Sequence, residues 1–74
     1  MDMRSIRLLS DEQLLDAIED KREELFNLRF QRAAGQLEDT NLVRYAQHDL
    51  ARLLTARRER ELAALSTGGE ESHA

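Results

Sequence analysis

Residues 25–40 read LFNLRFQRAAGQLEDT, and this stretch decides the fold. Its first half places apolar residues beside Asn, Arg and Gln, and two alanines and Gly35 then break the pattern. A glycine that follows a helical pattern commonly takes the left-handed conformation that ends a helix. The sequence therefore predicts a helix that ends at Ala34 and a tight connection over about residues 35–39.

The stretch SDEQ, which begins at Ser10, marks the start of this helix. Ser10 can cap the helix, and Gln13 stands three residues later, which is the spacing of a capping box. Leu9 lies before the cap and Leu14 at the fourth helical position, the arrangement of a hydrophobic staple. We therefore expect the first helix over about residues 11–34.

Apolar residues recur at helical spacing on both sides of the connection. After it, Asp39 or Thr40 can cap a second helix, which we expect over about residues 40–65. Two long helices joined by so short a connection lie antiparallel. The predicted apolar faces are Leu14, Ile18, Leu25 and Leu28, flanked by Leu15, Phe26 and Phe30, on the first helix, and Leu42, Val43, Ala46, Leu50, Leu53 and Leu54 on the second.

The sequence therefore predicts an all-α fold, an antiparallel two-helix hairpin over residues 1–65. A short N-terminal lead precedes residue 11, and we expect a mobile, disordered C-terminal tail over residues 66–74. The chain has 74 residues and no Cys, so it forms one small domain without a disulfide or a thiolate metal site. It has no apolar run of membrane-spanning length, and its N-terminus turns acidic too early for a signal peptide. We expect a cytoplasmic protein without a membrane partner.

Charge is unevenly distributed along the chain. The formal net charge of −4 argues against a nucleic-acid partner, since phosphate contacts need Lys or Arg. Residues 11–33 hold seven acidic and four basic side chains, whereas residues 42–65 are rich in Arg. Lys21 is the only lysine, so the basic residues are almost all Arg, whose planar guanidinium suits phosphate and ion pairs alike.

Catalysis and metal binding are not expected. A lone hairpin offers no concave pocket that could hold a nucleophile, a base and an orienting acid together. His48 is the only histidine in a predicted helix, its neighbour Asp49 points to a different side, and no His-x-x-x-His pair exists. We therefore predict that the chain is not an enzyme and that it has no metal, cofactor or small-molecule substrate.

Four polar residues share one side of the second helix, opposite its apolar face: Arg44, His48, Arg52 and Thr55. They form either an ordinary solvated face or a stripe that contacts phosphates. The second interpretation is favoured because no acid interrupts the stripe until Glu59, and surface helices usually interleave both signs of charge.

The first helix presents two further features. Asn27 and Gln31 lie one turn apart, away from the apolar stripe, as a neutral polar surface or as a contact surface. Phe26 and Phe30 have core spacing, but two helices cannot bury so wide a face between them. Some of this apolar surface should meet a third surface, either the N-terminal lead or a partner protein.

Three runs of residues carry a resemblance to a known family. They are ELFNLRFQ at 24–31 continued by AGQLE at 34–38, then DLARLLT at 49–55 followed by Arg58-Glu59, and RSIRLLSDEQL at 4–14. Together they resemble the bacterial large-subunit ribosomal proteins conventionally numbered twenty-nine. The resemblance covers roughly residues 4–62, with the three runs in the right order and at the right separations.

The resemblance implies a helical hairpin that is a structural constituent of the large ribosomal subunit, without catalytic activity or cofactor. It implies binding to the large-subunit (23S) rRNA near the mouth of the polypeptide exit tunnel. The implied neighbour is the tunnel-rim ribosomal protein conventionally numbered twenty-three, and nascent-chain factors dock nearby. The rival hypothesis is a free helical-hairpin adaptor that binds another protein and no RNA.

By position, the resemblance assigns RNA contacts to polar residues of both helices and of the connection. With the stripe residues added, the predicted RNA-binding set is Asn27, Arg29, Gln31, Gln36, Arg44, His48, Arg52 and Thr55. Phe26 and Phe30 are the predicted contacts to a protein partner.

Overall fold

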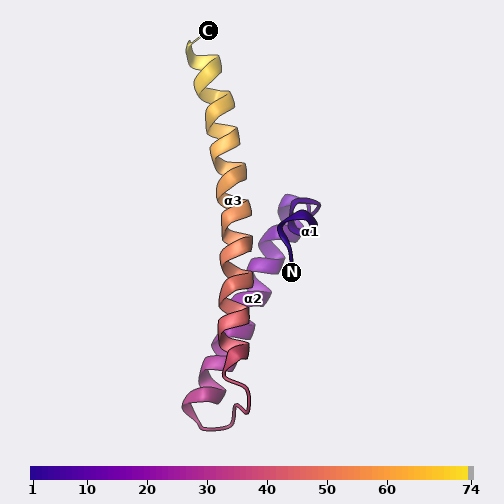
Figure 1. The fold of residues 1–74 in the computed structure, drawn as a ribbon. Coiled ribbons are helices and arrows are strands. Elements are labelled where there is room, and N and C mark those ends of the chain that lie inside the picture. The colour runs from indigo at the N-terminus through magenta and orange to yellow at the C-terminus, as the bar shows by residue number, and fades with distance from the viewer. Residues whose placement is uncertain (74) are drawn as a thin grey trace.

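The computed structural model describes the backbone of residues 1–73 and the side chains of residues 1–65. It contains three helices: α1 (Met3–Arg7), α2 (Asp11–Ala33) and α3 (Asn41–His73). Figure 1 shows α2 and α3 as antiparallel rods joined by one turn, with α1 folded back beside α3 at the opposite, open end of the hairpin. No strand occurs within residues 1–73, so the predicted all-α hairpin is confirmed.

The ends of α2 follow the local signals in the sequence. The Ser10 hydroxyl accepts a hydrogen bond from the Gln13 backbone N–H at 3.1 Å, and the Gln13 side chain accepts one from the Ser10 N–H at 2.9 Å. This is the predicted capping box. At the other end Ala34 is the cap and Gly35 has a φ of 72°, a left-handed value that a side chain at this position would strain.

The connection leads directly into α3. The Asp39 carboxylate accepts a hydrogen bond from the Asn41 backbone N–H at 2.9 Å, which satisfies one free donor at the helix start. The helix then runs to His73, beyond the predicted end near residue 65. No proline follows residue 65, and glycine only weakens a helix by about 1 kcal/mol per residue. The side chains of residues 66–74 and the backbone of Ala74 lie outside the described part of the chain. The predicted disorder of residues 66–74 therefore stays a prediction.

The predicted N-terminal lead contains the short helix α1. The Asp2 carboxylate accepts a hydrogen bond from the Ser5 backbone N–H at 2.8 Å, and this bond lowers the pKa of Asp2. Five residues are too few for a helix that stands alone, so packing must hold α1 in place. Ile6, only 1% exposed, supplies that packing, because it joins the core between α2 and α3.

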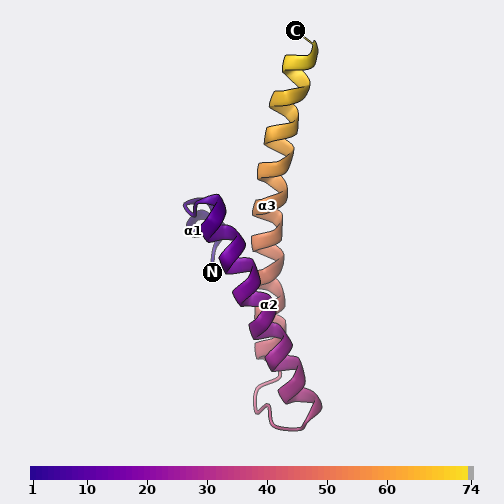
Figure 2. The ribbon, with the colours of Figure 1, turned by 180° about the vertical axis from the view of Figure 1, so that it is seen from behind.

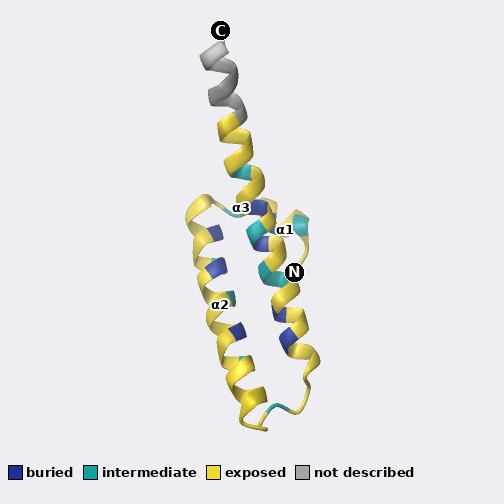
Figure 3. Ribbon diagram, turned by 90° about the vertical axis from the view of Figure 1, so that its left-hand side faces the viewer, coloured by how far each residue is buried: buried dark blue, intermediate teal, exposed yellow. Residues whose placement is uncertain are grey.

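The core lies along the facing sides of α2 and α3, as Figure 3 shows by the buried positions on each rod. It has one cluster at the open end and a smaller one near the turn. The open-end cluster consists of Ile6, Leu14, Ile18, Leu53 and Ala56, and the turn cluster of Leu25, Val43 and Ala46. Six of these residues belong to the predicted apolar faces. Leu42 is 42% exposed, whereas the buried Ala56 was not predicted, because alanine fits apolar and polar faces equally well.

The flank of α2 is not covered by the rest of the chain. Phe26 and Phe30 are 69% and 66% exposed, and Leu15 is 48% exposed. The core spacing of the two phenylalanines therefore does not put them in the core. The physical reason is that α2 has only α3 beside it over this length, while α1 packs at the open end (Figure 2). As far as the structure describes the helices, none has the length and apolarity needed to cross a membrane.

Arg60 ties α3 to the chain that links α1 and α2. Its guanidinium donates to the Leu9 carbonyl at 2.6 Å and lies 2.8 Å from the Asp11 carboxylate. It also reaches the Arg7 carbonyl at 3.5 Å. These contacts join residues about fifty positions apart in the sequence. Arg60 thus fixes the open end of the hairpin beside the Ile6 contact.

We expect Leu53→Ala to destabilise the isolated protein by about 2–5 kcal/mol, because Leu53 is fully buried between three helices and its truncation leaves a cavity. Urea unfolding followed by circular dichroism measures the change. Leu15→Ala is the matched control, because Leu15 lies on the exposed flank of α2. Equal losses for the two variants would mean that the core is packed differently.

We expect Arg60→Met to lower the free energy of unfolding by about 1–3 kcal/mol, because it removes hydrogen bonds from a charged donor to two elements. Amide hydrogen exchange should accelerate most within α1. Arg58→Met is the control, since among the side chains of residues 1–65 Arg58 pairs with Glu61 on its own helix and not with another element. Unchanged exchange in α1 would show that Arg60 does not hold that helix.

Candidate nucleic-acid interface

The four residues of the predicted polar stripe lie on the outer side of α3. Arg44, His48, Arg52 and Thr55 are all exposed, and they occupy successive turns of the helix. The buried residues of α3 lie on its other side, toward α2 (Figure 3). The direction of the stripe is therefore as predicted, and its chemistry depends on what each side chain already contacts.

Arg44 keeps its charge available. Its guanidinium donates to the Asn41 side-chain oxygen at 3.0 Å and lies over the Tyr45 ring, 5.8 Å from the ring centroid. An amide and an aromatic face orient a guanidinium without neutralising it. Arg44 is thus an oriented cation that can still meet an anionic group.

Arg52 differs, because an acid lies beside it. Its guanidinium is 3.1 Å from the Asp49 carboxylate, one turn earlier on α3. The expectation that no acid interrupts the stripe before Glu59 is therefore wrong at Arg52. The i, i+3 spacing puts the two residues on neighbouring turns of the same face of the helix, within reach of each other. The pair is exposed and adds little stability, but it reduces the positive field of the stripe at this point.

Asp49 also reaches α2 through Lys21. The Lys21 ammonium lies 3.7 Å from Asp49 and 2.7 Å from Glu24. The hydrogen bond to Glu24 is the main cause that raises the pKa of Lys21, and the charges of Glu24 and Asp49 add to it. The only lysine of the chain is thus committed to two carboxylates of the protein.

Thr55 and His48 complete the stripe with side chains that carry no permanent charge. The Thr55 hydroxyl donates to the Ala51 carbonyl of its own helix at 2.8 Å, so its oxygen remains free only as an acceptor. A neutral imidazole offers hydrogen bonds but little counterion release. The stripe is therefore less basic than its sequence suggests, and Arg44 is its one fully available charge.

The predicted residues of α2 and of the connection do not form one site with the stripe. Asn27, Arg29, Gln31 and Gln36 are exposed near the turn end of the hairpin. Helical geometry puts Arg29 on a different side of α2 from Asn27 and Gln31. Within residues 1–65, no side-chain hydrogen bond or ion pair connects this group to the stripe. The predicted RNA-binding residues are thus distributed over separate parts of the surface and do not form one compact site.

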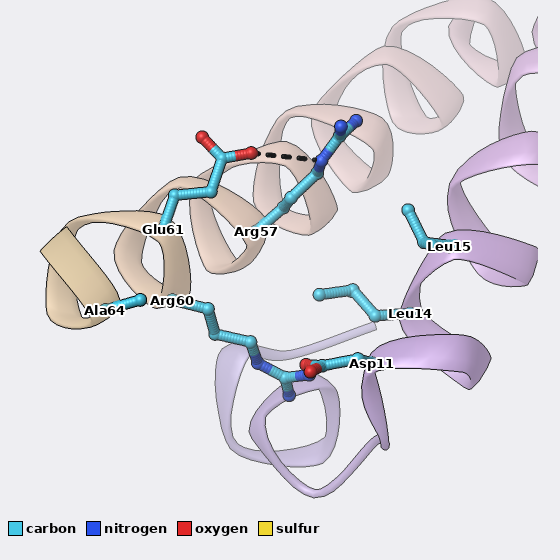
Figure 4. Close-up of a pocket in the computed structure, with 7 residues that line it drawn as sticks. All are labelled: Asp11, Leu14, Leu15, Arg57, Arg60, Glu61 and Ala64. Carbon is cyan, nitrogen blue, oxygen red and sulfur yellow. Dashed lines mark hydrogen bonds and ion pairs between the residues drawn. The ribbon is translucent and has the colours of Figure 1, made fainter.

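A shallow groove of about 330 Å³ lies at the open end, between α2 and α3. Figure 4 shows Leu14 and Leu15 on one wall and Arg57, which lies 3.3 Å from Glu61, on the other. Its lining contains no Ser, Thr, Cys, His or Lys. Among the residues that the structure describes, no group of three His, Cys, Asp or Glu side chains is placed to hold a metal ion.

Sequence reasoning missed three residues of this surface. The contact of the Tyr45 ring with Arg44 could not be predicted from the spacing of apolar residues. The acid beside Arg52 could have been found, since Asp49 and Arg52 have the spacing of a helical ion pair. Arg32, exposed in the last turn of α2, was not singled out, because it lies outside the runs of residues that carried the prediction.

We expect Lys21 to titrate above about 10.4, the value of a free lysine, because two carboxylates stabilise its charge. Because the folded-state pKa is raised, this stabilisation is complete below the unfolded-state pKa and disappears as the pH rises through the folded-state value. As the only lysine, Lys21 gives a single Cε signal for NMR titration. Glu24→Gln should lower its pKa more than Asp49→Asn does, and the opposite order would contradict the geometry.

The amino-acid sequence of the chain also matches those of known proteins. A family model described as ribosomal L29 protein matches residues 4–60. The chain is similar to the large ribosomal subunit protein uL29 of Mycolicibacterium vanbaalenii, with 50% identity over 90% of this chain and 88% of that protein. It is also similar to uL29 of Mycobacterium leprae, with 46% identity over 90% and 89%, and to uL29 of Saccharopolyspora erythraea, with 46% over 93% and 88%. The chain belongs to the ribosomal L29 protein family.

Proposed function

We propose that the chain is a structural, non-enzymatic constituent of the large ribosomal subunit in the cytoplasm, and that it binds 23S rRNA near the mouth of the polypeptide exit tunnel. The match to the L29 family over residues 4–60 is the observation that supports this most strongly. Relatives named as large-subunit proteins, with 46–50% identity over most of the chain, support the subunit assignment.

RNA binding is supported by the form and surface of the hairpin. Structured RNA is recognised largely through its shape, its phosphates and its 2′-hydroxyl groups. A rod with exposed guanidinium, amide and hydroxyl groups suits such contacts, and Arg44, Asn27 and Gln31 are of this kind. Contacts of this type fix the position of a protein on RNA and read little sequence.

A protein neighbour is supported by the exposed flank of α2. Phe26 and Phe30 are mostly exposed although they are large and apolar. Aromatic residues are enriched at the centres of protein interfaces. We propose that these two side chains contact the tunnel-rim ribosomal protein conventionally numbered twenty-three, in the region where nascent-chain factors dock.

We expect the chain to sediment with the large subunit through a sucrose gradient at moderate salt, because its many contacts to RNA and protein together persist during centrifugation. Immunoblotting of the gradient fractions measures its distribution. A chain recovered only in the slowly sedimenting fractions would support the free adaptor and contradict the proposal. Gradients run after nuclease treatment of the lysate provide the control, because the signal should then leave the subunit peak.

A further inference from the structure

The cations of the chain fall into two groups, according to whether a carboxylate neutralises them. Besides the N-terminal ammonium, which lies 3.9 Å from Asp49, six basic side chains have a carboxylate oxygen within 4.0 Å: Arg7 with Glu59, Lys21 with Glu24 and Asp49, Arg52 with Asp49, Arg57 and Arg58 with Glu61, and Arg60 with Asp11. All the other arginines of α3 are thus paired, and Arg44 is the exception. These pairs reduce the positive potential of the middle and the open end of the hairpin.

Among the described side chains, five arginines have no carboxylate within that distance: Arg4, Arg22, Arg29, Arg32 and Arg44. Three of them surround the turn. Arg29 and Arg32 lie in the last turns of α2, and Arg44 lies in the first turn of α3. The available positive charge is therefore concentrated at the turn end.

The acidic residues are concentrated at the other end. Residues 1–24 carry eight acidic and four basic side chains, so Arg4 and Arg22 stand among an excess of acids. Residues 25–46 carry three basic side chains, the same three arginines, against Glu38 and Asp39. The hairpin is thus a rod whose open end is acidic and whose turn end is weakly basic.

We propose that the turn end of the hairpin docks on the phosphate backbone of rRNA through Arg29, Arg32 and Arg44, and that Arg52 and the arginines at 57–60 stay paired within the protein. This inference rests on the proposed function and adds to it an orientation and a contact residue, Arg32. The acidic open end then points away from the phosphates.

Screening explains how an acidic protein can bind a polyanion in this way. The Debye length is about 8 Å at physiological ionic strength. The rise of α2 separates the two ends of the hairpin by about 35 Å at 1.5 Å per residue. A phosphate at the turn end therefore senses the three unpaired arginines together with Glu38 and Asp39, and hardly senses the acids at the start of α2, Asp11, Glu12 and Asp16. The net charge of the whole chain does not decide the contact.

The local geometry favours guanidinium–phosphate contacts at this end. Asn41 and the Tyr45 ring hold the Arg44 guanidinium in place, which reduces the conformational entropy lost on binding. Guanidinium groups bind phosphate oxygens through two parallel hydrogen bonds. Arg52 would have to give up Asp49 to make the same contact, whereas Arg32 and Arg44 lose no ion pair.

The test compares two double variants with equal loss of charge. Arg32→Gln with Arg44→Gln removes unpaired arginines, and Arg57→Gln with Arg58→Gln removes paired ones. Binding of each full chain to full-length large-subunit rRNA is measured by filter binding over a range of KCl concentrations. The slope of log affinity against log salt should fall by about two units for the first variant and stay unchanged for the second. Equal slopes, or a larger fall for the second, would overturn the inference.

A second measurement does not depend on the variants' affinity. The chain has no native cysteine, so Gln36→Cys and Glu12→Cys each create a unique site for a tethered iron chelate. In reconstituted large subunits, hydroxyl radicals from position 36 should cleave the rRNA strongly and those from position 12 weakly. Equal cleavage or the reverse order would overturn the orientation. If the unmodified chain neither binds the rRNA nor sediments with the subunit, the proposed function itself fails, and this outcome is distinct from a changed orientation.

Discussion

The packing of Leu53 is the contact on which the rest of the structure depends. This side chain is wholly buried where α1, α2 and α3 meet, against the cluster that contains Ile6, Leu14 and Ile18. A two-helix hairpin of this length has a small core, and domains of this size are marginally stable. Ile6 adds a third element to that core, and the Arg60 hydrogen bonds fasten that element to α3. A rigid rod is the result, and a rigid rod can present fixed charges to an extended partner.

The pairing of charges on the surface matters more than their number. An excess of acids gives the chain a net charge of −4, yet most of these acids lie toward the open end or neutralise an arginine within the protein. Screening limits each phosphate to the charges within about one Debye length. The unpaired arginines around the turn are therefore compatible with an RNA partner, while the ion pairs at the open end serve the fold.

Local features of the sequence predicted most of the fold. The capping box at Ser10, the left-handed Gly35 and the 3.6-residue periodicity of Leu14, Ile18 and Leu25 are short-range signals, and the structure contains all of them. Helix α1 was not predicted, because a helix of five residues is too short to be stable alone and depends on the burial of Ile6. Arg60 could not be placed for a similar reason, since its partners lie about fifty residues away in the sequence.

The surface was harder to predict than the core. Hydrophobic spacing alone cannot say whether a third element covers Phe26 and Phe30, and within the described part of the chain none does. The predicted stripe left out Asp49, although its i, i+3 spacing places it beside Arg52. The contacts of Arg60 and Lys21 to other helices, in contrast, are visible only once the side chains are placed.

A density map of the large subunit that contains this chain tests the central claim most directly. The account predicts the turn end against rRNA, with the guanidinium groups of Arg32 and Arg44 at hydrogen-bond distance from phosphate oxygens, about 2.7–2.9 Å. It predicts that Arg57 and Arg58 remain on Glu61. A map that shows the turn in solvent and the arginines of 57–60 on phosphates would contradict the account.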